Sequence, residues 1–151
     1  MLPEVLWKIP KKGTFNLHAS LLPQYRGAAP INWAIINGET KTGVTTFFID
    51  HQIDTGAIID SIPCPIQSED NASSLHDKLM VAGTQLVIKT LEAIANNRAH
   101  SKAQKDSDQL RSAPKLNPEN TRIIWDSPAK QIVNLIRGLD SYPGAWTTLI
   151  R

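Results

Sequence analysis

Polar and apolar residues alternate along residues 14–18, which is the pattern of a β-strand whose two faces meet different surroundings. On this predicted strand Asn16 and His18 are two positions apart, so their side chains point to the same face. Two further runs, 43–49 and 57–66, are rich in apolar, β-branched or aromatic residues. Both runs are predicted to be strands as well.

The clearest helical pattern covers residues 73–97. Its apolar residues recur at spacings of three or four positions, or multiples of these, as on the buried face of an amphipathic helix. These residues are Leu75, Leu79, Ala82, Leu86 and Ile94. Residues 70–73 precede the helix and supply capping side chains. A shorter helix is predicted over residues 31–36, and Asn37 with Gly38 ends it.

After the long helix the periodicity weakens. Residues 99–121 are rich in Ser, Lys, Gln, Asp and Asn, so we predict a linker or an extended crossing there. A strand is expected over residues 122–125. A helix is then expected, with Ser127 as its N-cap and Pro128 at its first helical position. The opening of one more strand is expected at 145–150.

The order of these elements predicts an α/β fold with a mixed sheet. Three or four strands and one long helix are too few to complete a doubly wound sheet. We therefore predict that the chain is one part of a larger fold.

Composition adds limited information. The chain has 151 residues, of which 41% are apolar and 20% charged, as in an ordinary globular domain. No run approaches ~18 consecutive apolar residues, and the first residues lack the pattern of a secretory signal. With Cys64 as its only cysteine, the chain cannot form an internal disulfide or a thiolate metal cluster. These observations favour a cytoplasmic protein.

Charge is unevenly distributed along the chain. Residues 1–97 contain seven Lys or Arg and nine Asp or Glu, whereas residues 98–151 contain nine and five. A mildly acidic first part and a basic second part are compatible with a nucleic-acid partner for the second part.

Asn16, His18 and Asp54 form the candidate catalytic group. Asp54 begins an Asp-Thr-Gly turn, for which an Asx-type turn is the simpler explanation. For Asn16 and His18 the simpler explanation is a hydrogen-bonded pair near a strand end, because burying them unpaired is costly. Together, an amide, an imidazolium and a carboxylate have the chemistry of acyl transfer to an amine. The first two can stabilise an oxyanion, and the third can accept the proton that the amine loses.

Other kinds of site have weaker support. His18, His51, His76 and Asp54 lack the spacing of metal ligands, so no metal is expected. Ser20 lacks the G-x-S-x-G setting of a hydrolase nucleophile. Neither a G-x-G-x-x-G sequence nor a P-loop is present.

The sequence between residues 16 and 56 resembles the folate-binding signature of the 10-formyltetrahydrofolate-dependent formyltransferases. The matching segments are Asn-Leu-His-Ala-Ser-Leu-Leu-Pro at 16–23, Tyr-Arg-Gly-Ala-Ala-Pro-Ile at 25–31, Asn-Gly-Glu at 37–39, Thr-Gly-Val-Thr at 42–45 and Ile-Asp-Thr-Gly at 53–56. The signature is long and ordered. It is shared by relatives that formylate glycinamide ribonucleotide or amino sugars, so it indicates the superfamily and not one substrate.

The resemblance assigns roles residue by residue. It implies that Asn16 orients the formyl oxygen, that His18 stabilises its developing negative charge, and that Asp54 helps to deprotonate the incoming amine. It also implies a tetrahydrofolate site lined by Ser20, Leu21, Leu22 and Pro23. The fold that it implies is the C-terminal half of a Rossmann-like formyltransferase sheet.

The second half of the chain resembles the methionyl-tRNA formyltransferase family. The segments are Ala-Pro-Lys-Leu at 113–116, Arg-Ile-Ile-Trp-Asp at 122–126, Ile-Arg-Gly-Leu-Asp at 136–140 and Tyr-Pro-Gly-Ala-Trp-Thr at 142–147. In that family a small C-terminal β-barrel helps to bind tRNA, and Lys and Arg would supply salt-dependent phosphate contacts. The resemblance implies three parts. They are the C-terminal part of a catalytic domain (1–98), a linker (99–112) and the start of a tRNA-binding domain (113–151).

The leading hypothesis is transfer of a formyl group from 10-formyltetrahydrofolate to the α-amine of methionyl-tRNA. The expected protein is a monomer at full length, without a membrane partner. Two alternatives remain open: formylation of a sugar amine or another small amine, and binding of folate or tRNA without catalysis. The resemblance covers nearly the whole chain but only the middle of the family's length. It therefore implies that this chain alone is poorly folded or inactive, because half of its sheet would lack neighbours.

Overall fold

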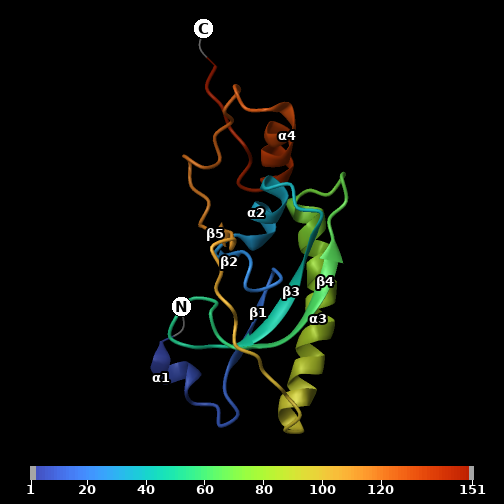
Figure 1. Cartoon of the computed structure of the whole chain (residues 1–151). Coiled ribbons are helices and arrows are strands. Elements are labelled where there is room, and N and C mark those ends of the chain that lie inside the picture. The colour runs from blue at the N-terminus through green and yellow to red at the C-terminus, as the bar shows by residue number, and fades with distance from the viewer. Residues whose placement is uncertain (1–2, 150–151) are drawn as a thin grey trace.

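The computed structural model describes residues 3–149, and within them it contains four helices and five strands. In chain order these are α1 (Glu4–Trp7), β1 (Phe15–His18), β2 (Arg26–Gly27), α2 (Pro30–Ile36), β3 (Lys41–Phe48), β4 (Ile58–Pro65), α3 (Ala72–Ala95), β5 (Ser112–Ala113) and α4 (Ala129–Gly138). Figure 1 shows α3 running lengthwise beside β3 and β4, with α4 and α1 toward opposite ends of the molecule. The α/β architecture predicted from the sequence is confirmed.

The main sheet has three strands in the order β1-β3-β4, and both pairings are antiparallel. Residues 42–47 of the central strand β3 are all buried, because side chains on both of its faces are covered. Helix α3 packs against β3 and β4. The core contains Ile35, Val44, Leu75, Leu79 and Leu86.

Helix α3 begins at a capping box, as the polar residues before it predict. The Asn71 side chain accepts a hydrogen bond from the Ser74 N–H, and the Ser74 hydroxyl accepts one from the Asn71 N–H. The three leucines of the predicted apolar face are buried, and its alanine and isoleucine are half-buried. Neither α3 nor any other helix of residues 3–149 is long and apolar enough to cross a membrane.

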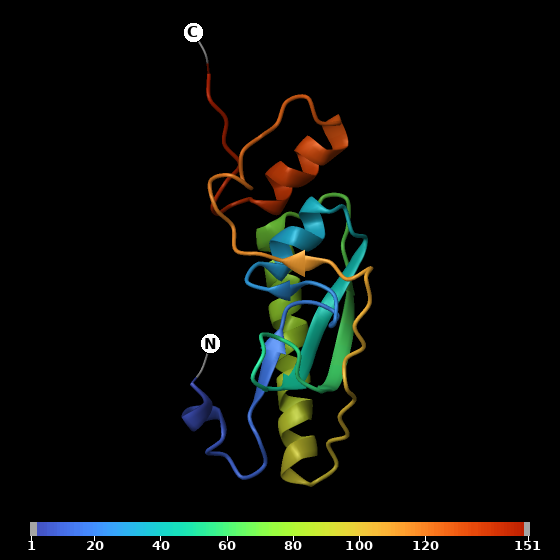
Figure 2. The ribbon, with the colours of Figure 1, turned by 60° about the vertical axis from the view of Figure 1, so that its left-hand side comes forward.

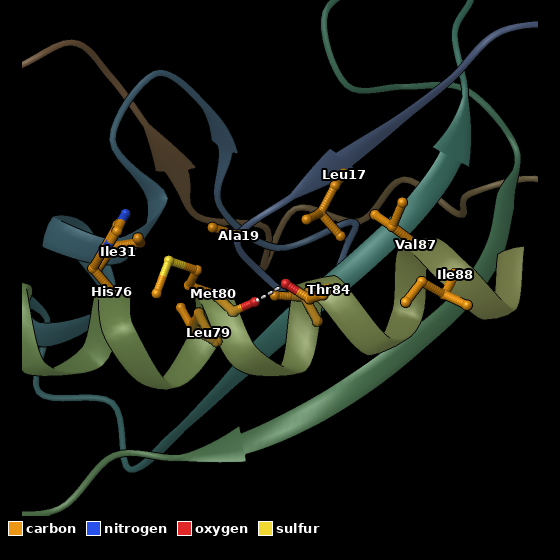
Figure 3. A pocket seen from close by; sticks show the side chains of 11 residues that line it. Leu17, Ala19, Ile31, His76, Leu79, Met80, Thr84, Val87 and Ile88 are labelled. Carbon is orange, nitrogen blue, oxygen red and sulfur yellow. Dashed lines mark hydrogen bonds between the residues drawn. The ribbon is translucent and has the colours of Figure 1, made fainter. Parts of the chain in front are cut away.

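An apolar groove of about 450 Å³ lies between α3 and β1. In Figure 3, Leu17 faces side chains of α3 across this groove, and Met80 and Ile88 are among the residues that line it. Gly83 permits the close approach, since a Cβ atom there would lie 2.7 Å from Leu17 Cδ2. Within residues 3–149, β1 pairs only with β3, so it is an edge of the sheet. The sheet therefore lacks a neighbour on this side.

The chain returns from the end of α3 along the sheet in an extended conformation, as Figure 2 shows. We call residues 99–111 the crossing segment. Lys102 in this segment forms an antiparallel bridge with Ile58, through two N–H···O bonds of 2.8 Å. The segment ends at β5, which pairs in parallel with β2. Of the two predicted forms, an extended crossing is therefore the one observed. No periodic pattern marks β5, because two residues carry no period.

Residues 114–149, here called the C-terminal region, depart most from the sequence predictions. Helix α4 begins at Ala129 with Pro128 as its N-cap, so the predicted cap at Ser127 is wrong by one residue. The expected strands at 122–125 and 145–150 reduce to a single bridge between Arg122 and Trp146, with residue 150 outside the described range. An isolated pair of strands has little independent stability. The predicted start of a barrel is not confirmed by residues 113–149.

The C-terminal region is attached to α2 and to the first turn of α3. At Gly138 a Cβ atom would lie 2.7 Å from Ile36 Cγ1, so α4 and α2 are in close contact. Asn32 Nδ2 donates to the Gly138 carbonyl oxygen at 2.8 Å. The Asp140 carbonyl oxygen then accepts a hydrogen bond from the Ser73 N–H at 3.2 Å.

Candidate active site

Strand β1 carries two of the three predicted catalytic residues. Only 6% of His18 is exposed, whereas Asn16 is exposed. Their two-residue spacing on the strand places both on one face. Their burial differs because the loop after β1 folds back over His18, and His18 Nε2 lies 2.8 Å from the carbonyl oxygen of Tyr25.

The turn that carries Asp54 has a constrained backbone. The φ angle of Asp54 is 56°, in the left-handed region that few residues other than glycine adopt. Gly56 lies so close to β3 that a Cβ atom would be 1.6 Å from the carbonyl oxygen of Phe48, which leaves no room for a side chain. Gln104 Nε2 donates to the carbonyl oxygens of Asp54 and Gly56, both at 2.8 Å. The crossing segment thus holds this turn.

His18 and Asp54 meet in a mostly buried pair. His18 Nδ1 and Asp54 Oδ2 are 3.6 Å apart. Because the Tyr25 carbonyl oxygen can only accept a hydrogen bond, Nε2 is the protonated nitrogen of that contact, and Nδ1 is the nitrogen that faces the carboxylate. The Gly27 N–H donates to the same Asp54 Oδ2 at 3.0 Å. Imidazole and carboxylate are therefore each fixed by a backbone group.

Asn16, the third predicted catalytic residue, borders the same cleft as Asp54. The cleft has a volume of about 600 Å³, within the usual range for small-molecule sites. Asn16 Oδ1 accepts a hydrogen bond from the Leu17 N–H at 3.0 Å. Its amide NH₂ has no hydrogen-bond partner among residues 3–149 and is available to a ligand.

The four predicted folate-binding residues form the loop after β1. Ser20 and Leu22 are buried, whereas Leu21 and Pro23 are half-buried. Thr45 of β3 anchors the loop, because its hydroxyl donates to the Ser20 carbonyl oxygen at 2.6 Å and accepts from the Leu22 N–H at 3.2 Å. The Ser20 hydroxyl donates to a carbonyl oxygen of the same loop at 2.5 Å. The polar groups of Ser20 are thus used internally, and the predicted lining of a folate site stays a prediction.

The remaining predicted candidates lie elsewhere. His51 is an exposed loop residue whose Nδ1 is 3.5 Å from Glu4 Oε2, and its ring meets that of Trp7 edge-on. His76 is exposed on α3, with its Nδ1 3.2 Å from Asp77 Oδ1. Among residues 3–149 there is no group of three side chains that could hold a metal ion.

Sequence reasoning missed two residues that hold the site, Tyr25 and Gln104. Tyr25 is buried at a φ of 59°, and its hydroxyl donates to Glu39 Oε1 at 2.6 Å. Burial raises the pKa of Tyr25, and the hydrogen bond to Glu39 raises it further, so the phenol stays protonated. Tyr25 lies within the family signature, but nothing in its spacing points to His18. Gln104 lies in a stretch without periodicity and carries no signal.

Two family models match the chain. The model described as "Formyl transferase" matches residues 1–91, and the model described as "Formyl transferase, C-terminal domain" matches residues 115–151.

Similar curated proteins include methionyl-tRNA formyltransferases. The protein of that name from Bacteroides thetaiotaomicron is 56% identical over 153 aligned positions, which cover 99% of this chain and 48% of that protein. The one from Flavobacterium johnsoniae is 58% identical over 149 positions, which cover 99% and 47%. The chain thus spans about half the length of the curated relatives it matches.

Two solved structures share the fold of this chain. An N-formyltransferase from Helicobacter canadensis, in complex with folinic acid and dTDP-3-aminofucose, has a TM-score of 0.75 and 33% identity, over 82% of this chain and 46% of that chain. HypX from Aquifex aeolicus, in complex with tetrahydrofolic acid, has a TM-score of 0.82 and 25% identity, over 97% and 25%. The shared fold agrees with the family model, which covers more than half of the sequence. This chain belongs to the formyl transferase family.

Proposed function

We propose that the polypeptide containing this chain transfers a formyl group from 10-formyltetrahydrofolate to the α-amine of methionyl-tRNA. The observation that carries the proposal is the buried contact between His18 and Asp54, at a cleft that Asn16 also lines. The tRNA substrate is supported by the names of relatives that are 54–58% identical to this chain.

In the proposed reaction the amine nitrogen bonds to the formyl carbon, and the bond from that carbon to N10 of the folate breaks. The amine loses a proton, and N10 gains one. Asn16 has its amide NH₂ available at the cleft, so it would donate to the formyl oxygen as negative charge develops there. Asp54 would accept the proton of the amine, directly or through a water molecule.

His18 would stabilise the same negative charge from a fixed position. Its Nε2 is held by the Tyr25 carbonyl oxygen and its Nδ1 faces Asp54, so neither nitrogen is free in this conformation. A direct hydrogen bond from His18 to the formyl oxygen therefore requires one of these contacts to open. Without such opening, His18 would act by holding the Asp54 carboxylate in place.

We place the folate beside Asp54 and along the loop formed by Ser20, Leu21, Leu22 and Pro23. The cleft combines polar side chains with the apolar residues Phe15, Phe47 and Ile53, which suits a flat ring system with hydrogen-bonding edges. Folinic acid and tetrahydrofolic acid are bound by two of the related proteins, which supports the class of co-substrate. No metal enters the proposed reaction.

We further propose that residues 113–151 begin a tRNA-binding domain with a small β-barrel and that residues 99–112 join it to the catalytic domain. Two arginines, one in the joining segment and one in α4, already have partners: Arg111 Nη1 is 2.9 Å from Glu39 Oε1, and Arg137 Nη1 donates to the Asp70 carbonyl oxygen at 2.8 Å. Four lysines are exposed, namely Lys102, Lys105, Lys115 and Lys130. We expect these lysines to contribute more phosphate contacts than the two arginines.

A tRNA substrate would place the protein in the cytoplasm, and we expect a monomer at full length.

A second candidate is formylation of a sugar amine or another small amine. It is favoured by the 33% identity to the Helicobacter canadensis enzyme, whose structure contains dTDP-3-aminofucose. A third reading, binding of folate or tRNA without catalysis, has no observation of its own in its favour.

The test is a formylation assay on a polypeptide of family length that contains this chain. The assay supplies 10-formyltetrahydrofolate and methionyl-tRNA, and compares the unsubstituted protein with His18→Ala and Asp54→Ala. Loss of transfer in both variants with folate still bound supports the proposal. Folate binding without formylation of tRNA, but with formylation of an amino sugar, selects the second candidate. If the protein binds folate but Asp54→Ala changes no rate, the third candidate, binding without catalysis, is selected.

A further inference from the structure

We propose that Gln104 is a positioning residue for Asp54, through which the crossing segment sets the geometry of the proton acceptor. The inference rests on the proposed function, because it gives Gln104 a role in the reaction that is assigned to Asp54. Gln104 lies far from Asp54 in the sequence and is half-buried in the structure.

The side-chain amide of Gln104 uses all of its hydrogen-bonding groups. Nε2 donates to the carbonyl oxygens of Asp54 and Gly56, both at 2.8 Å. Oε1 accepts from Arg26 Nε at 3.0 Å and from Arg26 Nη2 at 2.8 Å. A carboxamide has two N–H donors and two oxygen lone pairs, so this environment matches glutamine and not glutamate.

Gln104 affects the position of the Asp54 carboxylate by two routes. The first runs through the backbone of Asp54 itself, whose φ of 56° is a conformation that the surroundings must hold in place. The second runs through Arg26, because the next residue, Gly27, donates its N–H to Asp54 Oδ2 at 3.0 Å. Gln104 thus touches both the residue that bears the carboxylate and the neighbour of the group that orients it.

The crossing segment is itself anchored on both sides of Gln104. On one side, Lys102 and Ile58 exchange two backbone hydrogen bonds of 2.8 Å. On the other side, the Arg111 carbonyl oxygen accepts a hydrogen bond from the Tyr25 N–H at 2.7 Å. Tyr25 is also the residue whose carbonyl oxygen contacts His18. Residues 102–111 are therefore held beside the site by backbone hydrogen bonds at both ends.

The sharpest test is Gln104→Glu in the family-length polypeptide. Glutamate keeps an oxygen for Arg26 but replaces the two donors with an acceptor that faces two carbonyl oxygens. We expect kcat for formyl transfer to fall by roughly tenfold to a hundredfold, as for a misplaced reacting group, and KM for the folate to change by less than about threefold. The matched control is Asp106→Asn, which alters an exposed partner of Arg26 in the same segment and leaves the contacts of Gln104 in place. The control should keep kcat within about twofold.

Asp54→Ala is measured as well, both alone and combined with Gln104→Glu. This comparison distinguishes a failure of the inference about Gln104 from a failure of the proposed function. If Gln104 acts through Asp54, the double variant is no slower than Asp54→Ala. If Asp54→Ala is inactive but Gln104→Glu transfers at the unsubstituted rate, the inference about Gln104 is overturned and the proposed function stands. If Asp54→Ala is fully active, the proposed function and the inference both fail.

Gln104→Met keeps the test decisive if the glutamate variant does not fold. Methionine has a similar shape, lacks the donors and introduces no charge. A folded Gln104→Met protein with the same selective loss of kcat supports the inference. A folded one with the unsubstituted kcat, or with only a raised KM, overturns it.

Discussion

The candidate site and the C-terminal region are built in different ways. Three segments distant in sequence converge on the site: β1 with the loop after it, the turn at Asp54 and the crossing segment. The C-terminal region adjoins the rest through α2, the loop before α3 and the first turn of α3. Several of its large apolar side chains are exposed, with 65% of Ile124, 64% of Trp125 and 85% of Tyr142 accessible.

Under the proposed function, this difference assigns the formyl-transfer step to the first part of the chain and contact with tRNA to the C-terminal region. The hydrogen bonds that fix His18 and Asp54 come from residues before 114, so the candidate site does not depend on the C-terminal region for its geometry. The exposed aromatic and lysine side chains of the C-terminal region instead suit a surface that meets a partner. Substitutions in the two regions should therefore change different measured quantities.

Among the substitutions that compare the two regions, Gly56→Ala beside the candidate site is expected to have the largest effect. The new Cβ atom would lie 1.6 Å from the Phe48 carbonyl oxygen, so the turn must move away from β3. We expect a loss of about 3 kcal/mol in the free energy of unfolding. Formyl transfer should fall by about a hundredfold, because Asp54 moves with the turn. Urea unfolding and the transfer assay measure the two effects.

Gly144→Ala in the C-terminal region is the matched control. Among residues 3–149, no atom beyond its chain neighbours lies within 4 Å of its added Cβ, and only the φ of 84° is unfavourable. We expect it to cost about 1 kcal/mol and to leave the transfer rate unchanged. Equal losses of rate in both glycine variants would remove the distinction between the regions.

The next effect concerns Asp70, in the loop onto which the C-terminal region docks. Burial alone would raise the pKa of Asp70. Hydrogen bonds from Lys78, the Gln67 N–H and Ser74 outweigh it, so this pKa lies below its ordinary value. A carboxylate with a lowered pKa stabilises the fold above its unfolded pKa of about 4, and this contribution is lost as the pH falls through the folded pKa.

Asp70→Asn should therefore lower the free energy of unfolding at pH 7 by about 1 to 2 kcal/mol. The difference from the unsubstituted protein should shrink as the pH falls below about 4. Urea unfolding from pH 3 to pH 7 measures it. A difference that stays constant over this range would contradict the assigned cause.

The smallest effect is expected from Gly138→Ala, at the contact of α4 with α2. The added Cβ would press on Ile36 Cγ1 at 2.7 Å and displace α4. We expect KM for methionyl-tRNA to rise about fivefold, which corresponds to about 1 kcal/mol of lost binding. Folate affinity, measured by titration, should not change. Weakened folate binding would show that the site does depend on the C-terminal region.

The sequence predicted the elements whose patterns repeat. Strands β1, β3 and β4 and helices α2 and α3 were predicted to within a few residues, because buried faces impose a period on the sequence. The strands expected in the C-terminal region were wrong, since the single bridge there has no neighbouring strand to extend it. Helix α1 and the two-residue strands β2 and β5 are too short to carry a period.

The site was predictable only in part. The residue types of Asn16, His18 and Asp54 suggested acyl transfer, but their spacing could not show that His18 and Asp54 meet. The resemblance to a family supplied that expectation, and the structure brings the two side chains to 3.6 Å. Gln104 could not be predicted, because its role depends on where the crossing segment lies in space and not on a local pattern.

The proposed formyl transfer depends most on the Asp54 carboxylate, and Asp54→Asn in the family-length polypeptide tests this role directly. Asparagine keeps an oxygen that can accept the Gly27 N–H, but it cannot take up a proton from the amine. Single-turnover transfer to methionyl-tRNA should slow by about a hundredfold to ten-thousandfold, with unchanged folate affinity. A folded Asp54→Asn protein that transfers the formyl group at the unsubstituted rate would contradict the account.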